Sequence, residues 1–277
     1  MAIDQNIIDT IDLFSLPEIA QKVLATMEDE NTSVEDIDRL VSKDFVLSSR
    51  LLKVANTVFF RRSGEVSTVF NALMTVGFNV ARSLLVALSV RDLCRNTVPF
   101  ERSIWEHNLG VSLFSHFLAQ ECRYPVPGEA LVTGLIHDIG KAVLYRSAPE
   151  RYSRVIDEVR ERGASFYQAE GEILGTDHCQ VGGLVMARWK LPDTIRDAVE
   201  SHHRVHRVSP DGVMRLGHVV SIADALCWNE GIGFKRDGEP LWTDDWEAVG
   251  LSRDGLVRLG AEVKEIYESQ KQYLLNL

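Results

Sequence analysis

Apolar residues recur at helical spacing along most of the chain. Between residues 16 and 24 the apolar side chains stand three, four, seven and eight positions apart, which is the period of a helix face that packs on a core. No segment alternates apolar and polar residues over several positions between hairpin turns, as a half-buried strand would. The pattern therefore predicts an all-α protein. In the first third, further helical faces lie at 37–41, 45–55, 69–76 and 79–93.

Capping residues mark where several of these helices are expected to begin. Ser15 before Leu16-Pro17 predicts a helix start, because serine can cap and proline suits the first helical position. Ser33 with Asp36 three residues later resembles a capping box. Ser67 is expected to open the helix at 69–76.

Pro99 interrupts the helical pattern, and a domain boundary is expected there. Residues 1–98 would form an N-terminal helical subdomain, and residues 99–277 a second helical unit. An exposed loop is expected at 231–240. Within the second unit, helices are predicted at 101–121, 129–139, 149–162, 165–174, 177–189, 192–203, 214–227, 245–249 and 254–273.

The composition is that of a soluble globular protein. The 277 residues are 45% hydrophobic and 25% charged. A net charge of -10 argues against nucleic acid as the main partner, because phosphate binding needs clustered basic residues. The strongest apolar run, at 84–90, is far shorter than the ~20 residues that span a bilayer, so no membrane segment is expected. Four scattered cysteines without a signal peptide favour a cytoplasmic location.

The candidate chemistry lies in histidine and aspartate residues of the second half. Imidazole nitrogens and carboxylate oxygens are ligands for divalent transition metals, and two neighbouring ions can hydrolyse a phosphate ester. We therefore expect one or two ions, with iron, manganese, nickel and zinc as candidates. The candidate ligands are His107, His137, Asp138, His178, His202, His203 and Asp224.

Local features favour a shared site for some of these residues. Neighbours on a helix point roughly 100° apart, so His137 and Asp138 can reach one site only across a helix end, which Gly140 is expected to provide. Lys141 lies just beyond and can offer a positive charge to a phosphate oxygen. His178 is placed in the first turn of its helix, capped by Thr176 or Asp177, where the positive helix end keeps it neutral.

Each residue alone also has an ordinary structural interpretation. A single histidine such as His107 is most often a surface or satisfied core residue, and His202-His203 would fit a solvated helix end. Asp224, on an apolar helix face, needs a partner or a metal to offset its burial. Cys179 is not expected to be a ligand. Three further histidines match no site pattern and are expected to be structural or exposed, namely His116, His206 and His218.

The order His, His-Asp, Asp resembles the HD superfamily of all-helical, metal-dependent phosphohydrolases, in which a divalent metal activates a water. His-Asp-Ile-Gly-Lys at 137–141 is similar to the HD-GYP subgroup of cyclic-di-GMP phosphodiesterases, which adds a second metal. The resemblance implies catalytic roles for Asp138 and for Lys141, which would hold the phosphate. It implies a first ion on His107, His137, Asp138 and Asp224, and a second on His178, His202 and His203 with Asp138 as the bridge.

The first half of the chain resembles the HDOD domain, the HD-related output domain. The likeness spans about residues 16–207 and is carried by Leu16-Pro17, by the segments 42–56 and 72–77, and by Trp189-Lys-Leu-Pro before the His-His pair. HDOD proteins are bacterial signalling modules, and many have lost the HD ligands. This chain differs, because every position of the two-metal set is filled. It also lacks the Asp-Gly-x-Gly-Tyr-Pro loop of HD-GYP proteins, which argues against cyclic-di-GMP as the substrate.

Two functions follow as hypotheses. The first is a regulatory protein that works through signalling protein partners, with a metal that senses state or stabilises the fold. The second is a metal-dependent phosphohydrolase that acts on a nucleotide or another phosphoester. The resemblance favours the first, and the complete ligand set keeps the second open.

Overall fold

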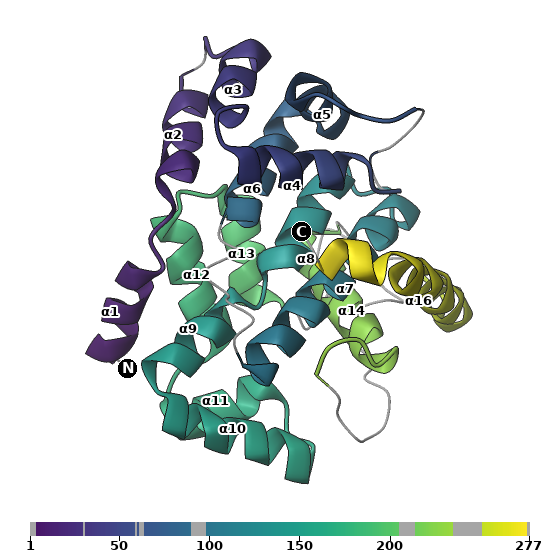
Figure 1. The fold of residues 1–277 in the computed structure, drawn as a ribbon. Coiled ribbons are helices and arrows are strands. Elements are labelled where there is room, and N and C mark those ends of the chain that lie inside the picture. The colour runs from purple at the N-terminus through teal and green to yellow at the C-terminus, as the bar shows by residue number, and fades with distance from the viewer. Residues whose placement is uncertain are drawn as a thin grey trace. The chain divides into compact units, whose positions relative to one another are not determined.

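The structure, a computed structural model, describes residues 4–29, 31–58, 60, 64–89, 98–204, 214–234 and 251–275. Every regular element in this part of the chain is a helix (Figure 1). The predicted all-α class is therefore confirmed. His206, the predicted helix at 245–249 and most of the predicted loop at 231–240 lie outside the described residues.

The chain divides into two compact units, one of residues 16–93 and one of residues 1–15 with 94–275. The predicted N-terminal subdomain had included residues 1–15, which the structure groups with the second unit. Two contacts account for this difference. The indole nitrogen of Trp189 donates to the carbonyl of Phe14 at 2.9 Å, and Arg188 pairs with Asp12 at 2.9 Å.

The unit of residues 16–93 contains helices that begin close to the predicted positions. The Ser33 and Asp36 capping box is present, as predicted. Two predicted caps were wrong: Thr68 rather than Ser67 caps the fourth of these helices, and Pro17 precedes the first without a side-chain cap. The helices are α2 (Glu18–Met27), α3 (Val34–Val41), α4 (Phe45–Ala55), α5 (Val69–Val76) and α6 (Phe78–Ser89).

The other unit is built around α7 (Pro99–Glu121), which packs against α8, α14 and α16. Pro99 occupies the first turn of α7, so it begins a long helix rather than only breaking a pattern. The remaining helices are α1 (Gln5–Leu13), α8 (Pro127–Ile136), α9 (Ile139–Ser147), α10 (Pro149–Arg162), α11 (Phe166–Leu174), α12 (His178–Arg188), α13 (Asp193–Ser201), α14 (Leu216–Asn229) and α16 (Arg253–Leu275).

A helix break and a close helix contact position the residues of interest. The break between α8 and α9 lies at His137 and Asp138. The predicted interruption at Gly140 was therefore wrong, because Gly140 lies inside α9. Gly140 instead lets α9 approach α12, because a Cβ there would lie 2.1 Å from the carbonyl oxygen of His178. This contact brings the start of α9 next to the start of α12.

Within the described residues, no single helix is long and apolar enough to cross a membrane. α5 and α6 together meet the length and composition, but the pair is bent by 114°.

Candidate metal centre

The seven predicted ligands all lie in the unit built around α7, and the structure brings them together. Each comes from a helix or from the residues at a helix end, and six of the seven are buried. The exception is His203, whose side chain is 25% exposed. In chain order, α7 carries His107, the α8–α9 break His137 and Asp138, α12 His178, the end of α13 His202 and His203, and α14 Asp224.

Asp138 lies between two groups of histidines. Its Oδ2 is 3.6 Å from Nε2 of His137 and 3.9 Å from Nε2 of His107. Its Oδ1 is 3.3 Å from Nε2 of His178 and 3.9 Å from Nε2 of His202. One carboxylate oxygen therefore faces each group, which is the arrangement that a bridging ligand requires.

Asp224 completes the side of His107. Its Oδ1 lies 2.8 Å from Nε2 of His107 and 4.0 Å from Nε2 of His137. Its Oδ2 lies 3.9 Å from Nδ1 of His203. A charged aspartate on an apolar helix is costly to bury unless it has a partner. His107 is such a partner, and its ion pair with Asp224 offsets the cost.

Three of the histidines are oriented by an oxygen behind the ring. Nδ1 of His137 donates to the carbonyl of Gly134 at 2.8 Å, and Nδ1 of His202 donates to the carbonyl of Val199 at 2.8 Å. Nδ1 of His178 donates to Oε2 of Glu170 at 2.6 Å. Because a neutral imidazole has one N–H, these bonds leave Nε2 of all three rings without a proton, as a metal ligand needs.

The bare nitrogens fit a bound cation. Nε2 of His178 and Nε2 of His202 face each other at 3.3 Å, where two lone pairs repel unless positive charge lies beside them. Nitrogens bound to one tetrahedral zinc at its usual bond length would lie about 3.3 Å apart. Within the described part of the chain, Nε2 of His137 and Oδ1 of Asp138 are buried without a hydrogen-bond partner. A divalent transition metal would satisfy these orphaned groups.

Burial and charge keep most of these groups in their ligand forms. His107 is the exception: burial lowers the pKa of His107, but Cys227 and Asp224 raise it to about 10. Burial lowers the pKa of His137 to about 3, and it lowers the pKa values of His178, His202 and His203 as well, so these rings stay neutral. Burial opposes ionisation of Asp138, but its electrostatic interactions with the adjacent His137 and with the Lys141 ammonium hold the pKa of Asp138 well below its usual range.

Lys141 is buried beside the bridge. Its Nζ lies 2.5 Å from Oδ2 of Asp138 and 4.8 Å from the centre of the Phe166 ring. The ammonium thus provides positive charge next to the carboxylate. Its predicted role in holding a phosphate remains a prediction.

Two residues that the sequence did not point to also touch the histidines. Glu170 on α11 contacts His178, and Sγ of Cys227 on α14 lies 3.6 Å from Nδ1 of His107. Burial raises the pKa of Glu170 to about 8, while the hydrogen bonds that it accepts from Tyr152 and from the backbone of His178 act in the opposite direction. The contact of Cys227 joins segments 120 residues apart, and that of Glu170 joins two successive helices eight residues apart, so neither follows a recognisable sequence motif.

Cys179 was not expected to be a ligand, yet its sulfur belongs to a compact group with His178, His202 and His203. Sγ lies 3.7 Å from Nδ1 of His202 and 3.9 Å from Nε2. These nearly equal distances place the sulfur against the ring rather than along the lone pair of Nε2. Cys179 is therefore not aligned with the Nε2 lone pair of His202, although its sulfur lies close enough to the three histidines to share a metal site with them.

Two of the remaining histidines have structural roles, as predicted. His116 lies 3.3 Å from the carbonyl of Pro127, and Nδ1 of His218 accepts from the backbone N–H of Arg215. Asp177 caps α12 as one of the two expected caps, and its side chain accepts from the backbone N–H of Gln180.

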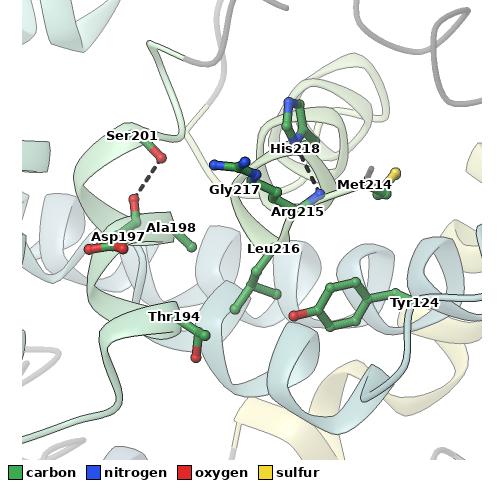
Figure 2. A pocket seen from close by; sticks show the side chains of 10 residues that line it. All are labelled: Tyr124, Thr194, Asp197, Ala198, Ser201, Met214, Arg215, Leu216, Gly217 and His218. Atoms are coloured by element: carbon green, nitrogen blue, oxygen red, sulfur yellow. Dashed lines mark hydrogen bonds between the residues drawn. The ribbon is translucent and has the colours of Figure 1, made fainter. Parts of the chain in front are cut away.

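A separate cavity of about 500 Å³ lies by α13 and α14 (Figure 2). Ser201 and Asp197 of α13 line one part of it, and Arg215 and His218 at the start of α14 line another. None of the seven candidate ligands lines this cavity. It is therefore distinct from the histidine and aspartate centre.

Comparison with known proteins assigns the family. Residues 13–205 match the family described as the HDOD domain. The chain belongs to the HDOD family. The match covers both compact units, from the end of α1 to the residues that follow His203.

Solved HDOD-like structures share this fold. An HDOD domain protein of unknown function from Geobacter sulfurreducens is 24% identical, with a TM-score of 0.69 over 94% of this chain and 90% of that chain. A protein of Marinobacter aquaeolei VT8, provisionally named a signal transduction protein, is 21% identical, with a TM-score of 0.73 over 99% of this chain and 62% of that chain. A protein of Shewanella amazonensis, provisionally named a phosphohydrolase, is 20% identical, with a TM-score of 0.68 over 98% and 96%.

Curated relatives are longer than the matched region. An uncharacterized protein of Treponema pallidum is 22% identical over 204 residues, which cover 72% of this chain and 39% of that protein. The uncharacterized protein YuxH of Bacillus subtilis is 24% identical over 129 residues, 47% of this chain and 31% of YuxH. The chain thus matches well under half the length of these two relatives.

Proposed function

We propose that this HDOD protein is a signal-transduction module whose HD-like unit holds one or two divalent transition-metal ions. Occupancy of the centre would control contacts with signalling protein partners. The observation that supports this most strongly is the convergence of three bare Nε2 atoms, from His137, His178 and His202, on the two oxygens of Asp138. Iron, manganese, nickel and zinc are the candidate ions, because imidazole suits iron, nickel and zinc, and carboxylates such as that of Asp138 suit manganese.

The burial of the centre favours regulation over turnover. His137, His178 and His202 are fully buried, and Asp138 is 1% exposed. Structural metal sites are closed, whereas catalytic sites keep a position open to substrate. A bound metal in such a site contributes to the stability of the fold and can report its state to a partner.

A metal-dependent phosphohydrolase acting on a nucleotide or another phosphoester is the second candidate. The partly exposed His203 and the buried cation of Lys141 beside Asp138 favour it. A bound divalent ion would supply Lewis-acid stabilisation of charge on a phosphate oxygen. In this case Lys141 would move from Asp138 toward the phosphate, and Asp138 would remain with the metal.

The proposal includes a bacterial, cytoplasmic setting. Cys122, Cys179 and Cys227 are free thiols, which a reducing compartment maintains.

Metal analysis of the purified protein tests the proposal. The protein should hold one to two equivalents of metal, directly or after reconstitution. His137→Ala should abolish retention because it removes a bare nitrogen, while the helices of residues 16–93 stay folded by circular dichroism. His116→Ala, which changes a buried histidine outside the centre, should retain the metal.

A hydrolase assay separates the two candidates. Cyclic dinucleotides and aryl phosphates would be offered to metal-loaded and metal-free protein. Turnover that needs both metal and Lys141 would favour the phosphohydrolase, and metal retention without turnover would favour the regulatory role. Failure to bind any metal after reconstitution would rule out both.

A further inference from the structure

Glu170 lies behind the centre and has no place in the ligand set described above. It is carried by α11 and is fully buried. A buried carboxylate is costly unless its oxygens receive hydrogen bonds. Its contacts therefore indicate what it does.

Both oxygens of Glu170 accept hydrogen bonds. Oε2 accepts from the backbone N–H of His178 at 2.8 Å and from Nδ1 of the same residue at 2.6 Å. Oε1 accepts from the hydroxyl of Tyr152 at 2.6 Å. Tyr152 on α10 is itself fully buried, so the carboxylate is clamped between α10 and the first residue of α12.

This arrangement differs from that of the other two oriented histidines. His137 and His202 donate to backbone carbonyls three residues earlier, so their orientation is fixed by their own helix ends. His178 is the first residue of α12, so the residue three positions earlier, Gly175, lies outside this helix, and Nδ1 of His178 bonds to Glu170 instead. A side chain from another helix has to take that role, and Glu170 does so.

We propose that Glu170, held by Tyr152, is the positioning residue for the metal ion on the His178 side of Asp138. It orients the imidazole and keeps the proton on Nδ1, so that Nε2 of His178 faces Oδ1 of Asp138. This role rests on the proposed metal-binding function. It goes beyond that function because Glu170 would support the binding of one ion through His178 without being a ligand of any ion.

The expected effect is selective. Loss of a carboxylate behind a metal-bound histidine typically weakens metal affinity about 10–100-fold. Only the ion that uses His178 should be affected, because His107, His137 and Asp224 have no contact with Glu170 among their described partners. At a metal concentration that just saturates the wild-type protein, the variant should therefore lose the ion on the His178 side and keep any ion on the His107 side.

The first measurement uses metal-free protein and nitrogen-15 NMR of the histidine side chains. Wild-type His178 should carry its proton on Nδ1. Glu170→Gln keeps an acceptor and should keep that tautomer, whereas Glu170→Leu removes the acceptor and should shift His178 toward the Nε2–H form. A wild-type His178 with its proton on Nε2, or a Glu170→Leu protein with an unchanged tautomer, would overturn the role.

The second measurement is a calorimetric titration with Zn²⁺. Wild-type protein should bind two ions, and Glu170→Gln should bind one of them about tenfold more weakly because the amide oxygen is a weaker acceptor for the Nδ1 proton of His178. Tyr152→Phe should weaken the same ion by less, because Glu170 remains but is less firmly held. Glu101→Gln is the matched control, since Glu101 is a buried carboxylate that pairs with Arg146 away from the centre.

The outcomes separate this role from the function on which it rests. Wild-type protein that binds no zinc contradicts the proposed metal function itself. Wild-type protein that binds one or two ions, with affinities that neither Glu170 variant changes, contradicts only the role of Glu170. Equal weakening of both ions would also contradict it, because a positioning effect through His178 is confined to one side.

Discussion

At the scale of single residues, Asp138 connects every part of the centre. It faces a histidine group with each oxygen and forms an ion pair with Lys141 through Oδ2. Both members of this pair are buried, with Lys141 only 4% exposed. Lys141 therefore supplies a full positive charge beside Asp138 that does not depend on a bound metal.

A charge-removing substitution tests this pairing. Asp138→Asn should lower the free energy of unfolding of the metal-free protein by about 3–5 kcal/mol, because it leaves the Lys141 ammonium buried and unpaired. Adding Lys141→Met should recover most of the loss, since an apolar side chain then replaces the ammonium. Chemical denaturation would measure both changes. An Asp138→Asn protein as stable as wild type would show that the pair has no structural weight.

At the scale of helices, two close approaches determine where the ligands lie. Gly140 on α9 meets the backbone of His178, and Gly182 on α12 lies where a Cβ would be 2.8 Å from Val199 of α13. Small residues at both crossings let α9, α12 and α13 converge. Their ends then present Asp138, His178 and His202 to one another.

A methyl group at the first crossing should separate these ends. Gly140→Ala would place a Cβ 2.1 Å from a backbone oxygen, and relieving such overpacking typically costs about 1–3 kcal/mol. Thermal unfolding should occur at a lower temperature, and metal affinity should fall with it. Gly171→Ala is the control, because a Cβ on that helical glycine meets nothing within 4 Å and alanine favours a helix. Equal behaviour of the two variants would contradict the role of Gly140.

The helices themselves could be predicted from the period of apolar residues, but their ends could not always be. Ser33 and Asp36 were identified because a capping box is a local pattern. The sequence predicted a helix break at Gly140, but the break lies at His137 and Asp138. Gly140 does not end its own helix; it makes room for the backbone of α12. The sequence placed residues 4–15 with the helices that follow them. The structure groups them with the other unit, because Trp189 bonds to Phe14 across a separation of 175 residues.

At the scale of the whole molecule, the chain combines an HDOD family match with a complete set of candidate HD ligands. The order of histidines and aspartates in the sequence was enough to nominate all seven, and the structure brings them together. Glu170 and Cys227 could not be nominated, because their partners lie on other helices and neither residue stands in a recognisable motif. The regulatory proposal joins the family to the buried metal centre.

The most direct test is anomalous X-ray scattering from crystals of the protein reconstituted with Zn²⁺ and measured on both sides of the zinc absorption edge. The account predicts one or two anomalous peaks beside the carboxylate of Asp138, one near Nε2 of His137 and one near Nε2 of His178. Crystals with no anomalous peak at this position, including crystals that bind zinc only elsewhere, would contradict the proposal that this centre binds metal.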